Sequence, residues 1–448
     1  MPDIETCATT EVPRPFMDGN KNQSNLVEGS PVFSDATLSP SSATLDDKIS
    51  QHEYSEGGMK AYLTVFGAFV ALFCTFGQMN SFGTYQAWYS VTAIRLKGDF
   101  RHRLTIISTT LTKGGPIGQL FDRFGPRALM ITGTVLYTFA IMMTSISSQY
   151  YQYILAQGIL FGLGVGLLFY PSLSSVSTYF SKYRATALGV AAAGSSVGGV
   201  VYPIILQRLF MIVGFGWGVR ISGLISAACC ISAVLTVTAL SSLKTSLPCA
   251  VSFKTFTDTQ YLLLALGSSL VALGLFIPFF YIVSYAEHLS LAPQTTFYVL
   301  AVMNAGGVFG RIAPAYLSDT LGRFNLLVPS ALLSGISCLT LWMFAHSVGL
   351  LMLFAAVYGF FSGAFISVIT PCVAQISDIR QIGIRIGVLY SIISFPSLVG
   401  GPAAGALLVR AHGSYTGMIA FSGSTVVAGS IFILLARFTI DSRIFARV

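Results

Sequence analysis

The chain has 448 residues, of which 54% are hydrophobic and only 9% are charged, whereas soluble domains carry roughly 25% charged residues. Uncharged apolar runs of about 20 residues recur along it, and each is long enough to cross a bilayer as a helix. This pattern excludes a chain of soluble domains and predicts an all-α polytopic membrane protein. The net charge of +8 does not indicate nucleic-acid binding, because the bases are scattered singly through short loops.

The first 58 residues form a polar segment rich in Ser, Thr, Asp and Asn, with ten acids and three bases. Such a composition predicts a disordered tail. The remaining 390 residues carry 22 bases and seven acids, and the positive-inside rule therefore places both termini in the cytoplasm. No cleavable signal peptide opens the chain, so we expect the first span to act as the targeting signal.

The apolar runs predict eleven membrane spans. In chain order they are 60–90, 128–147, 150–173, 188–208, 218–240, 259–286, 294–316, 324–345, 348–372, 384–409 and 416–437. We expect a disordered tail at 1–58, an N-terminal helical half at 59–240, a cytoplasmic linker at 241–258, a C-terminal helical half at 259–438 and a cytoplasmic tail at 439–448.

A short charged turn occurs twice, 197 positions apart, each time between two long apolar runs. Its residues are Asp122, Arg123, Gly125 and Arg127 in the first copy and Asp319, Gly322 and Arg323 in the second. A carboxylate at a helix end accepts hydrogen bonds from the N-terminus of an opposing helix or pairs with an arginine across a hairpin. Glycine permits the tight reversal. Two copies in register favour a gate between the similar halves of a secondary transporter. The alternative is that each turn is an ordinary cytoplasmic loop whose bases follow the positive-inside rule.

Two equivalent six-helix halves require a twelfth span near 100–120, so that both charged turns lie on the same side of the membrane. Residues 92–113 instead hold several bases, among them Arg95, Lys97, Arg101 and Arg103. A charge costs about 2.5–3.5 kcal/mol at the centre of an inserted helix. We therefore expect a poorly formed second span, which either inserts weakly beside its neighbours or reflects a gene-model error, and we favour the error.

Glycines recur at a spacing of four in two predicted spans, at Gly158, Gly162 and Gly166 and again at Gly359 and Gly363. Small residues at this spacing let helix backbones approach closely. We expect them to serve helix packing and not chemistry.

Two segments resemble signatures of a known family. Residues 179–199 read YFSKYRATALGVAAAGSSVGG, and residues 56–62 read EGGMKAY. Both are similar to signatures of the monocarboxylate transporter family within the major facilitator superfamily, and most similar to its fungal branch. The resemblance covers about 56–440 except 92–113. It implies twelve helices, alternating access and a small organic anion or related substrate.

The resemblance carries over to individual residues only in part. The substrate arginine of the family matches Arg311. The aspartate that usually stands four residues earlier in animal members is Gly307 here, and the lysine of the first span aligns with Asn80. These departures argue against proton-coupled transport of lactate-like acids.

The residues themselves also single out Arg311. Asn304, Gly307 and Arg311 share one face of a helix, and an arginine within the membrane must face a cavity or a partner. It could bind a substrate carboxylate. It could equally bond backbone carbonyls or belong to the gate, because Asp319 lies eight residues further on.

Other candidates for the substrate site come from three spans. Asn80 belongs to a polar stripe with Gly77 and Thr84, and Tyr170 and the aromatic run 279–281 could line the same cavity. We predict substrate contacts from Arg311 and Asn304, joined by Asn80 and Tyr170. Aromatic side chains on helices are more often packing residues.

The sequence contains few residues that could couple transport to an energy source. Acidic residues are missing from the middle of the predicted spans, which favours facilitated diffusion or a substrate whose own acid group carries the proton. The pair Glu287 and His288 is the remaining candidate relay, and a solvated loop pair is the simpler interpretation. The chain has no ATP-binding loop and no paired cysteine or histidine spacing, so we expect no cofactor, no metal and no enzyme activity.

Three functions remain open. The first is transport of a small organic solute, a monocarboxylate or related anion, with or without a proton. The second is export of a fungal secondary metabolite, which the aromatic content and the replaced Asp and Lys favour. The third is a non-transporting sensor or an inactive transporter, which the damaged second span favours. We expect the plasma membrane as the location by analogy with the family, with a vacuolar or other internal membrane as the alternative; the oligomeric state is open.

Overall fold

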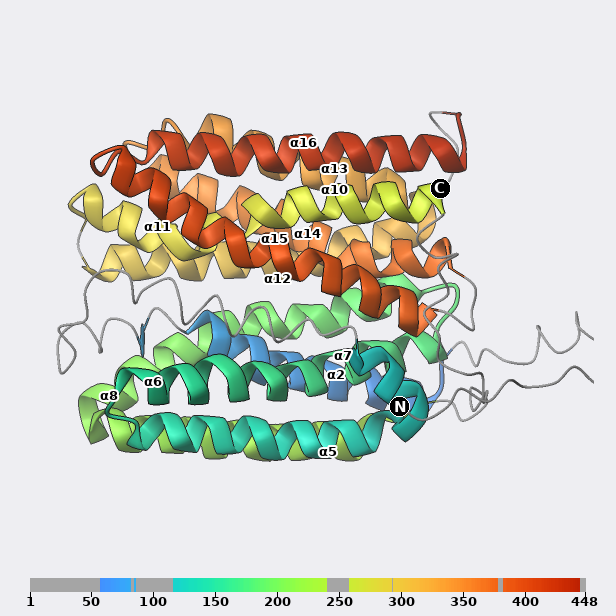
Figure 1. Cartoon of the computed structure of the whole chain (residues 1–448), viewed down its shortest axis with the longest axis horizontal. Coiled ribbons are helices and arrows are strands. Elements are labelled where there is room, and N and C mark those ends of the chain that lie inside the picture. Colours follow the sequence, from blue (N-terminus) through green and yellow to red (C-terminus); the bar gives the residue numbers. More distant parts are fainter. Residues whose placement is uncertain are drawn as a thin grey trace, which may run out of the picture. The chain divides into compact units, whose positions relative to one another are not determined.

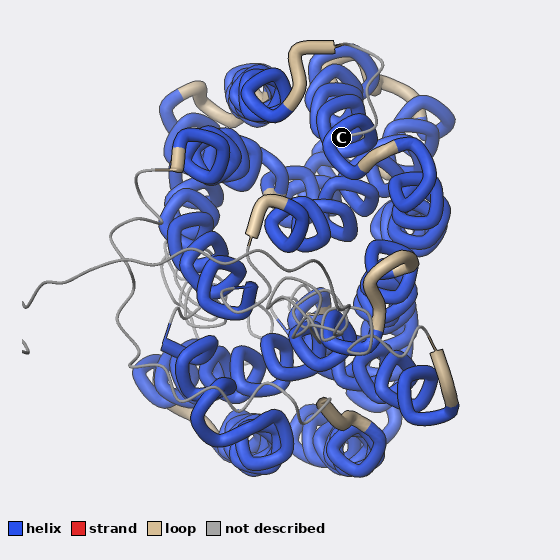
Figure 2. Tube along the Cα trace, turned by 90° about the vertical axis from the view of Figure 1, so that its right-hand side faces the viewer, coloured by secondary structure: helices blue, strands red, loops and turns tan. Residues whose placement is uncertain are grey.

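The computed structural model describes residues 57–81, 84–85, 116–239, 258–291, 293–377 and 382–443. These residues form helices and turns and contain no strand, which confirms the predicted all-α class. In lipid, a helix satisfies every backbone hydrogen bond within the segment, so long apolar runs fold as helices. The helices run side by side along one direction (Figure 1), and an end-on view shows their cross-sections next to one another (Figure 2).

The first group of helices precedes residue 240 and the second follows residue 257. The first group comprises α2 (Met59–Asn80), α5 (Pro116–Ile146), α6 (Tyr150–Tyr153), the π-helix η1 (Ile154–Leu160), α7 (Phe161–Tyr179) and α8 (Arg184–Thr236). The second comprises α10 (Thr259–Leu275), α11 (Ile277–His288), α12 (Pro293–Leu321), α13 (Arg323–Ser337), the π-helix η3 (Cys338–Trp342), α14 (Val348–Gln375), α15 (Ile382–Arg410) and α16 (Thr416–Ile440).

Helix α8 contains two of the predicted spans. At 53 residues and about 1.5 Å per residue it would be roughly 80 Å long if straight, far more than a bilayer core of about 30 Å. Gly214 divides it, with φ 76° and ψ 171°, a conformation that a residue without Cβ adopts readily. The break falls between the predicted spans 188–208 and 218–240.

Nine helical segments among the described residues are long and apolar enough to cross a membrane. This set counts α8 once and does not include α12, which is 29 residues long and carries Arg311 and Asp319. With α8 divided and α12 added, the described helices correspond to the eleven predicted spans. The first span was predicted to reach residue 90. Helix α2 ends at Asn80, Thr84 and Tyr85 are again helical, and residues 82–83 and 86–90 lie outside the described residues. The segment 92–113 lies outside the described residues.

Glycines bring helices within each group into close contact. A Cβ on Gly363 would lie 3.1 Å from Gly307 Cα, and a Cβ on Gly359 would lie 3.2 Å from Gly307 N. These two glycines of α14 therefore serve packing against α12, as predicted. In α7 the close approach is made by Gly164, whose added Cβ would lie 2.7 Å from Tyr137 N in α5.

Candidate functional site

Helices α8 and α12 pack along each other and join the two groups. The residues in contact are Ala185 and Thr186 with Asp319, Gly189 with Ala315, the set Ala192, Ser195 and Ser196 with Arg311, Ser196 with Gly307, and Gly199 with Asn304. Residue numbers rise along α8 as they fall along α12, so the helices are antiparallel. We call this contact the α8–α12 seam; on α12 it extends from Asn304 to Asp319, or roughly 22 Å.

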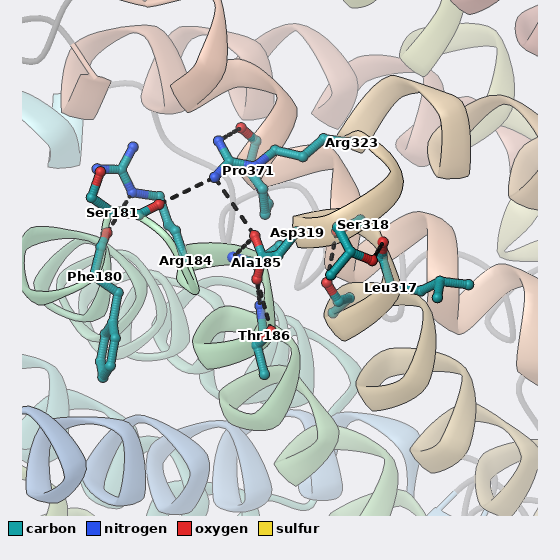
Figure 3. Close-up of polar contacts among 12 residues, drawn as sticks. Phe180, Ser181, Arg184, Ala185, Thr186, Leu317, Ser318, Asp319, Arg323 and Pro371 are labelled. Carbon is teal, nitrogen blue, oxygen red and sulfur yellow. Dashed lines mark hydrogen bonds and ion pairs between the residues drawn. The ribbon is translucent and has the colours of Figure 1, made fainter. Parts of the chain in front are cut away.

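Asp319 closes one end of the seam by capping α8. The residue before α8, Tyr183, offers no side-chain hydrogen bond to the helix. The Asp319 carboxylate instead accepts from the backbone nitrogens of Ala185 at 3.2 Å and Thr186 at 2.8 Å, and from Thr186 Oγ1 at 2.7 Å (Figure 3). A buried helix N-terminus needs acceptors for its free N–H groups, and its dipole favours a negative charge. A carboxylate of the second group of helices thus supplies the hydrogen-bond acceptors for the N-terminus of α8 in the first group.

Arg323 adds a second link at the same end. Its Nη2 lies 3.6 Å from Asp319 Oδ1, and the guanidinium donates to the carbonyl oxygens of Ser181 and Pro371 at 3.4 Å each (Figure 3). Ser181 lies just before α8 and Pro371 lies in α14. Arg323 therefore contacts both groups of helices beside the Asp319 cap.

The two copies of the charged turn share a backbone feature. Gly322 separates α12 from α13 with φ 104°, and Gly125 breaks α5 with φ 74°. Both conformations favour glycine, and the two residues stand at matching places in the repeat. The side chains of Asp122 and Arg123 lie outside the described residues, and Arg127 is exposed.

Arg311 lies in the middle of the seam and is 8% exposed. Its Nη1 donates to the Ala192 carbonyl oxygen at 3.2 Å, to Ser196 Oγ at 2.5 Å and to Ser195 Oγ. Its Nε is buried and has no hydrogen-bond partner among the described residues. The charge is thus held by the opposite helix, while one of its donors stays unused.

Asn80 and Asn304, both predicted from sequence, meet at a glycine of α8. A Cβ on Gly199 would lie 2.7 Å from Asn80 Nδ2 and 2.5 Å from Asn304 Oδ1. Asn304 is buried, and its amide nitrogen donates to the Leu300 carbonyl oxygen at 3.1 Å. Helices α2, α8 and α12 therefore bring uncharged donors and acceptors together at the second end of the seam.

Tyr170 belongs to an aromatic cluster that joins the two groups of helices. We define the aromatic cluster as Phe76 of α2, Phe169 and Tyr170 of α7, and Tyr390 of α15. Ring centroids lie 5.3 Å apart for Phe76 and Phe169, 5.7 Å for Phe169 and Tyr390, and 5.9 Å for Tyr170 and Tyr390. Phe76 lies one helical turn before Asn80, so α2 links the aromatic cluster to the pair of asparagines at Gly199.

Sequence reasoning missed Tyr390 and the serines of the seam. Tyr390 lies 220 positions from Tyr170, and no spacing rule relates residues on helices so far apart in the chain. Ser195 and Ser196 were part of the family signature, and the resemblance gave them no role. An intramembrane arginine needs acceptors, and this requirement is the signal that could have directed attention to hydroxyls on the neighbouring span.

Substituting Gly307 tests how tightly the seam is packed. A Cβ there would lie 2.7 Å from Ser196 Oγ, which must move and disturb its bond with Arg311 Nη1, so we expect Gly307→Ala to destabilise the protein by about 1 kcal/mol. Thermal unfolding of the purified protein measures this. Gly349→Ala in α14 is the matched control, because nothing lies within 4 Å of its added Cβ. Equal unfolding temperatures for the two variants would contradict close packing at Gly307.

Comparison with known proteins identifies the family. The model of the Major Facilitator Superfamily matches residues 109–328 and 262–443. An MFS-type transporter of Gibberella moniliformis (strain M3125 / FGSC 7600) is 38% identical over 389 residues, which cover 86% of this chain and 92% of that protein. The chain belongs to the major facilitator superfamily.

Two further relatives in this superfamily have names that state a function. The Agnestins efflux protein AgnL12 of Paecilomyces divaricatus is 38% identical over 392 residues, covering 86% of this chain and 88% of that protein. The Fujikurins efflux protein of Gibberella fujikuroi (strain CBS 195.34 / IMI 58289 / NRRL A-6831) is 33% identical over 387 residues, covering 85% and 83%. Membership of the major facilitator superfamily makes the chain a multi-pass membrane transporter of a small molecule.

Proposed function

We propose that this chain exports a secondary metabolite by alternating access, with the α8–α12 seam as the closed end of the transport path. The observation that carries the proposal is the set of polar contacts between the two groups of helices, from Arg311 to the Asp319 cap. The names of the two efflux relatives support export over uptake.

The seam contains groups that water can also satisfy, which suits a contact that must open and close. When α8 and α12 separate, the N–H groups of Ala185 and Thr186 and the side chains of Arg311 and Asp319 lose their hydrogen bonds across the seam. Water then supplies hydrogen bonds to these same groups. The difference in free energy between the closed and the open seam is then small, so a bound substrate can shift the equilibrium.

The orientation proposed from sequence fits the position of the seam. The end at which Asp319 lies also holds Lys182, Arg184 and Arg323, and the positive-inside rule places such an end in the cytoplasm. We retain cytoplasmic termini, the plasma membrane and the predicted division into a tail, two halves and a linker as parts of the proposal. Asp319, Gly322 and Arg323, with Asp122, Arg123, Gly125 and Arg127 of the first copy, are the proposed gate.

Transport of a monocarboxylate is the second candidate. It draws on the resemblance to the monocarboxylate transporter family and on the buried Nε of Arg311, a donor that a substrate carboxylate could take up. Export has the stronger support, because Arg311 Nη1 already binds α8 and the aspartate and lysine of the animal members are replaced by Gly307 and Asn80.

Deletion of the gene in the source organism, followed by mass spectrometry of cells and medium, tests the proposed function. We expect at least one metabolite to fall in the medium and rise inside the cells, and the wild-type gene to restore its export. Unchanged metabolites together with a loss of radiolabelled lactate uptake would contradict export and support the second candidate.

A further inference from the structure

We propose that the aromatic cluster binds a flat aromatic part of the exported molecule, and that Tyr170 Oη donates a hydrogen bond to a carbonyl or another acceptor at its edge. The proposal rests on the proposed function, since it names the substrate class of the same transport path. Its support comes from the hydrogen-bond status of Tyr170, the ring geometry and the position of the aromatic cluster between the two groups of helices.

The hydroxyl of Tyr170 is buried without a partner. The residue is 2% exposed, and its Oη makes no hydrogen bond among the described residues. Other buried tyrosines satisfy this group: Tyr390 Oη lies 2.9 Å from Thr370 Oγ1, and Tyr358 Oη donates to the Leu275 carbonyl oxygen at 2.6 Å. An unsatisfied buried hydroxyl is unfavourable. A ligand acceptor at Tyr170 would remove this penalty.

The rings are arranged so that a flat molecule can replace one of their contacts. Tyr390 meets Phe169 and Tyr170 at interplanar angles of 87° and 82°, both edge to face. Aromatic rings also pair in offset stacks of similar strength. An aromatic ligand that enters between Tyr170 and Tyr390 therefore replaces the contact between these two rings with one contact to each of them.

The position of the aromatic cluster couples binding to transport. Tyr170 lies in α7 of the first group and Tyr390 in α15 of the second, so their contact is lost when the groups separate at this level. A ligand that touches both residues would bind the separated and the closed arrangements with different affinity, which is the condition for a substrate to shift the equilibrium. Asn80, one helical turn from Phe76, and Asn304, which meets Asn80 at Gly199, add uncharged polar groups. This set suits a neutral aromatic molecule better than a carboxylate.

Binding of tritiated xanthone to the purified full-length protein in a scintillation proximity assay tests the proposal. Xanthone has a flat three-ring system with a carbonyl at its edge. We expect saturable binding, about three- to ten-fold weaker in Tyr170→Phe, which corresponds to the loss of one hydrogen bond. Xanthene lacks the carbonyl, so its affinity, measured by displacement of xanthone, should be the same for the wild-type protein and for Tyr170→Phe. The saturated ketone 1-decalone should compete less well than its partly aromatic counterpart 1-tetralone.

Tyr358→Phe is the matched control. It also removes one buried hydroxyl, but from a satisfied hydrogen bond. We expect it to bind xanthone like the wild type and to unfold at a lower temperature, while Tyr170→Phe unfolds at the wild-type temperature or above. Wild-type protein that does not bind xanthone, or Tyr170→Phe protein that binds it equally well, would overturn the proposal.

The outcomes separate this inference from the proposed function. If deletion of the gene blocks the release of a metabolite and xanthone does not bind, export stands and the aromatic site is wrong. If xanthone binding depends on Tyr170 and deletion leaves every metabolite unchanged, the aromatic site stands and export is wrong.

Discussion

Replacing Asp319 with asparagine is expected to reduce export by about thirty-fold at an equal amount of protein in the membrane. Asparagine has one acceptor oxygen where the carboxylate has two, so its NH₂ group must face one of the donors of Ala185 or Thr186. Charge-assisted hydrogen bonds contribute about 1.5–3 kcal/mol each. A loss of about 2 kcal/mol shifts the population of the closed seam about thirty-fold.

The measurement is the amount of exported metabolite released by cells of the deletion strain that carry each variant. Asp319→Glu keeps the charge on a longer side chain and should retain part of the export. Asp441→Asn, at the end of α16, is the control for loss of one carboxylate outside the seam and should export normally. Wild-type export by Asp319→Asn would show that the α8 cap has no role in transport.

Replacing Arg311 with methionine is expected to reduce export more than ten-fold because it holds the seam closed, whereas Asp319→Asn weakens the closed seam. Methionine has a similar length and no charge, and Ser195 Oγ keeps a bond to the Ala192 carbonyl oxygen at 2.7 Å, so we expect the protein to fold. An apolar side chain gains no hydration when the seam opens. The closed seam is therefore stabilised, and the protein stays in one state.

Arg311→Lys separates charge from geometry. The ammonium group keeps the charge but lacks the planar fork of donors, so we expect export between that of the wild type and that of Arg311→Met. Because Asp319→Asn opens the seam and Arg311→Met closes it, the double variant should export more than either single variant. Full export by Arg311→Met would show that this arginine is dispensable.

The helices were predictable because a bilayer accepts few backbone structures. Apolar runs of about 20 residues located the described spans, although the first was predicted to reach residue 90. The apolar sequence continues past Asn80, but α2 ends there and Ser81 follows in a turn, its N–H donating to the Gly77 carbonyl oxygen at 3.1 Å. Hydropathy does not locate such a turn within an apolar run.

The candidate site was only partly predictable. The charge and position of Asp319 indicated that it would cap an opposing helix or pair with an arginine. They did not indicate which helix, because that depends on the packing of α8 against α12. Asn80 and Asn304 were chosen on separate helices, and nothing in either run places them beside Gly199. Tyr390 could not be found at all, since its contacts with α7 arise only from the tertiary fold. The transport roles of these residues stay predictions.

The distance between α8 and α12 at the Asp319 cap shows directly whether the seam opens and closes. Spin labels at Tyr183→Cys and Leu321→Cys, both exposed beside the Asp319 cap, report it by pulsed electron–electron double resonance once the seven native cysteines are replaced by serine. We expect a short and a long distance in equilibrium, with the long one gaining population in Asp319→Asn and losing it in Arg311→Met. A single distance that is the same in all three proteins would contradict a seam that opens and closes.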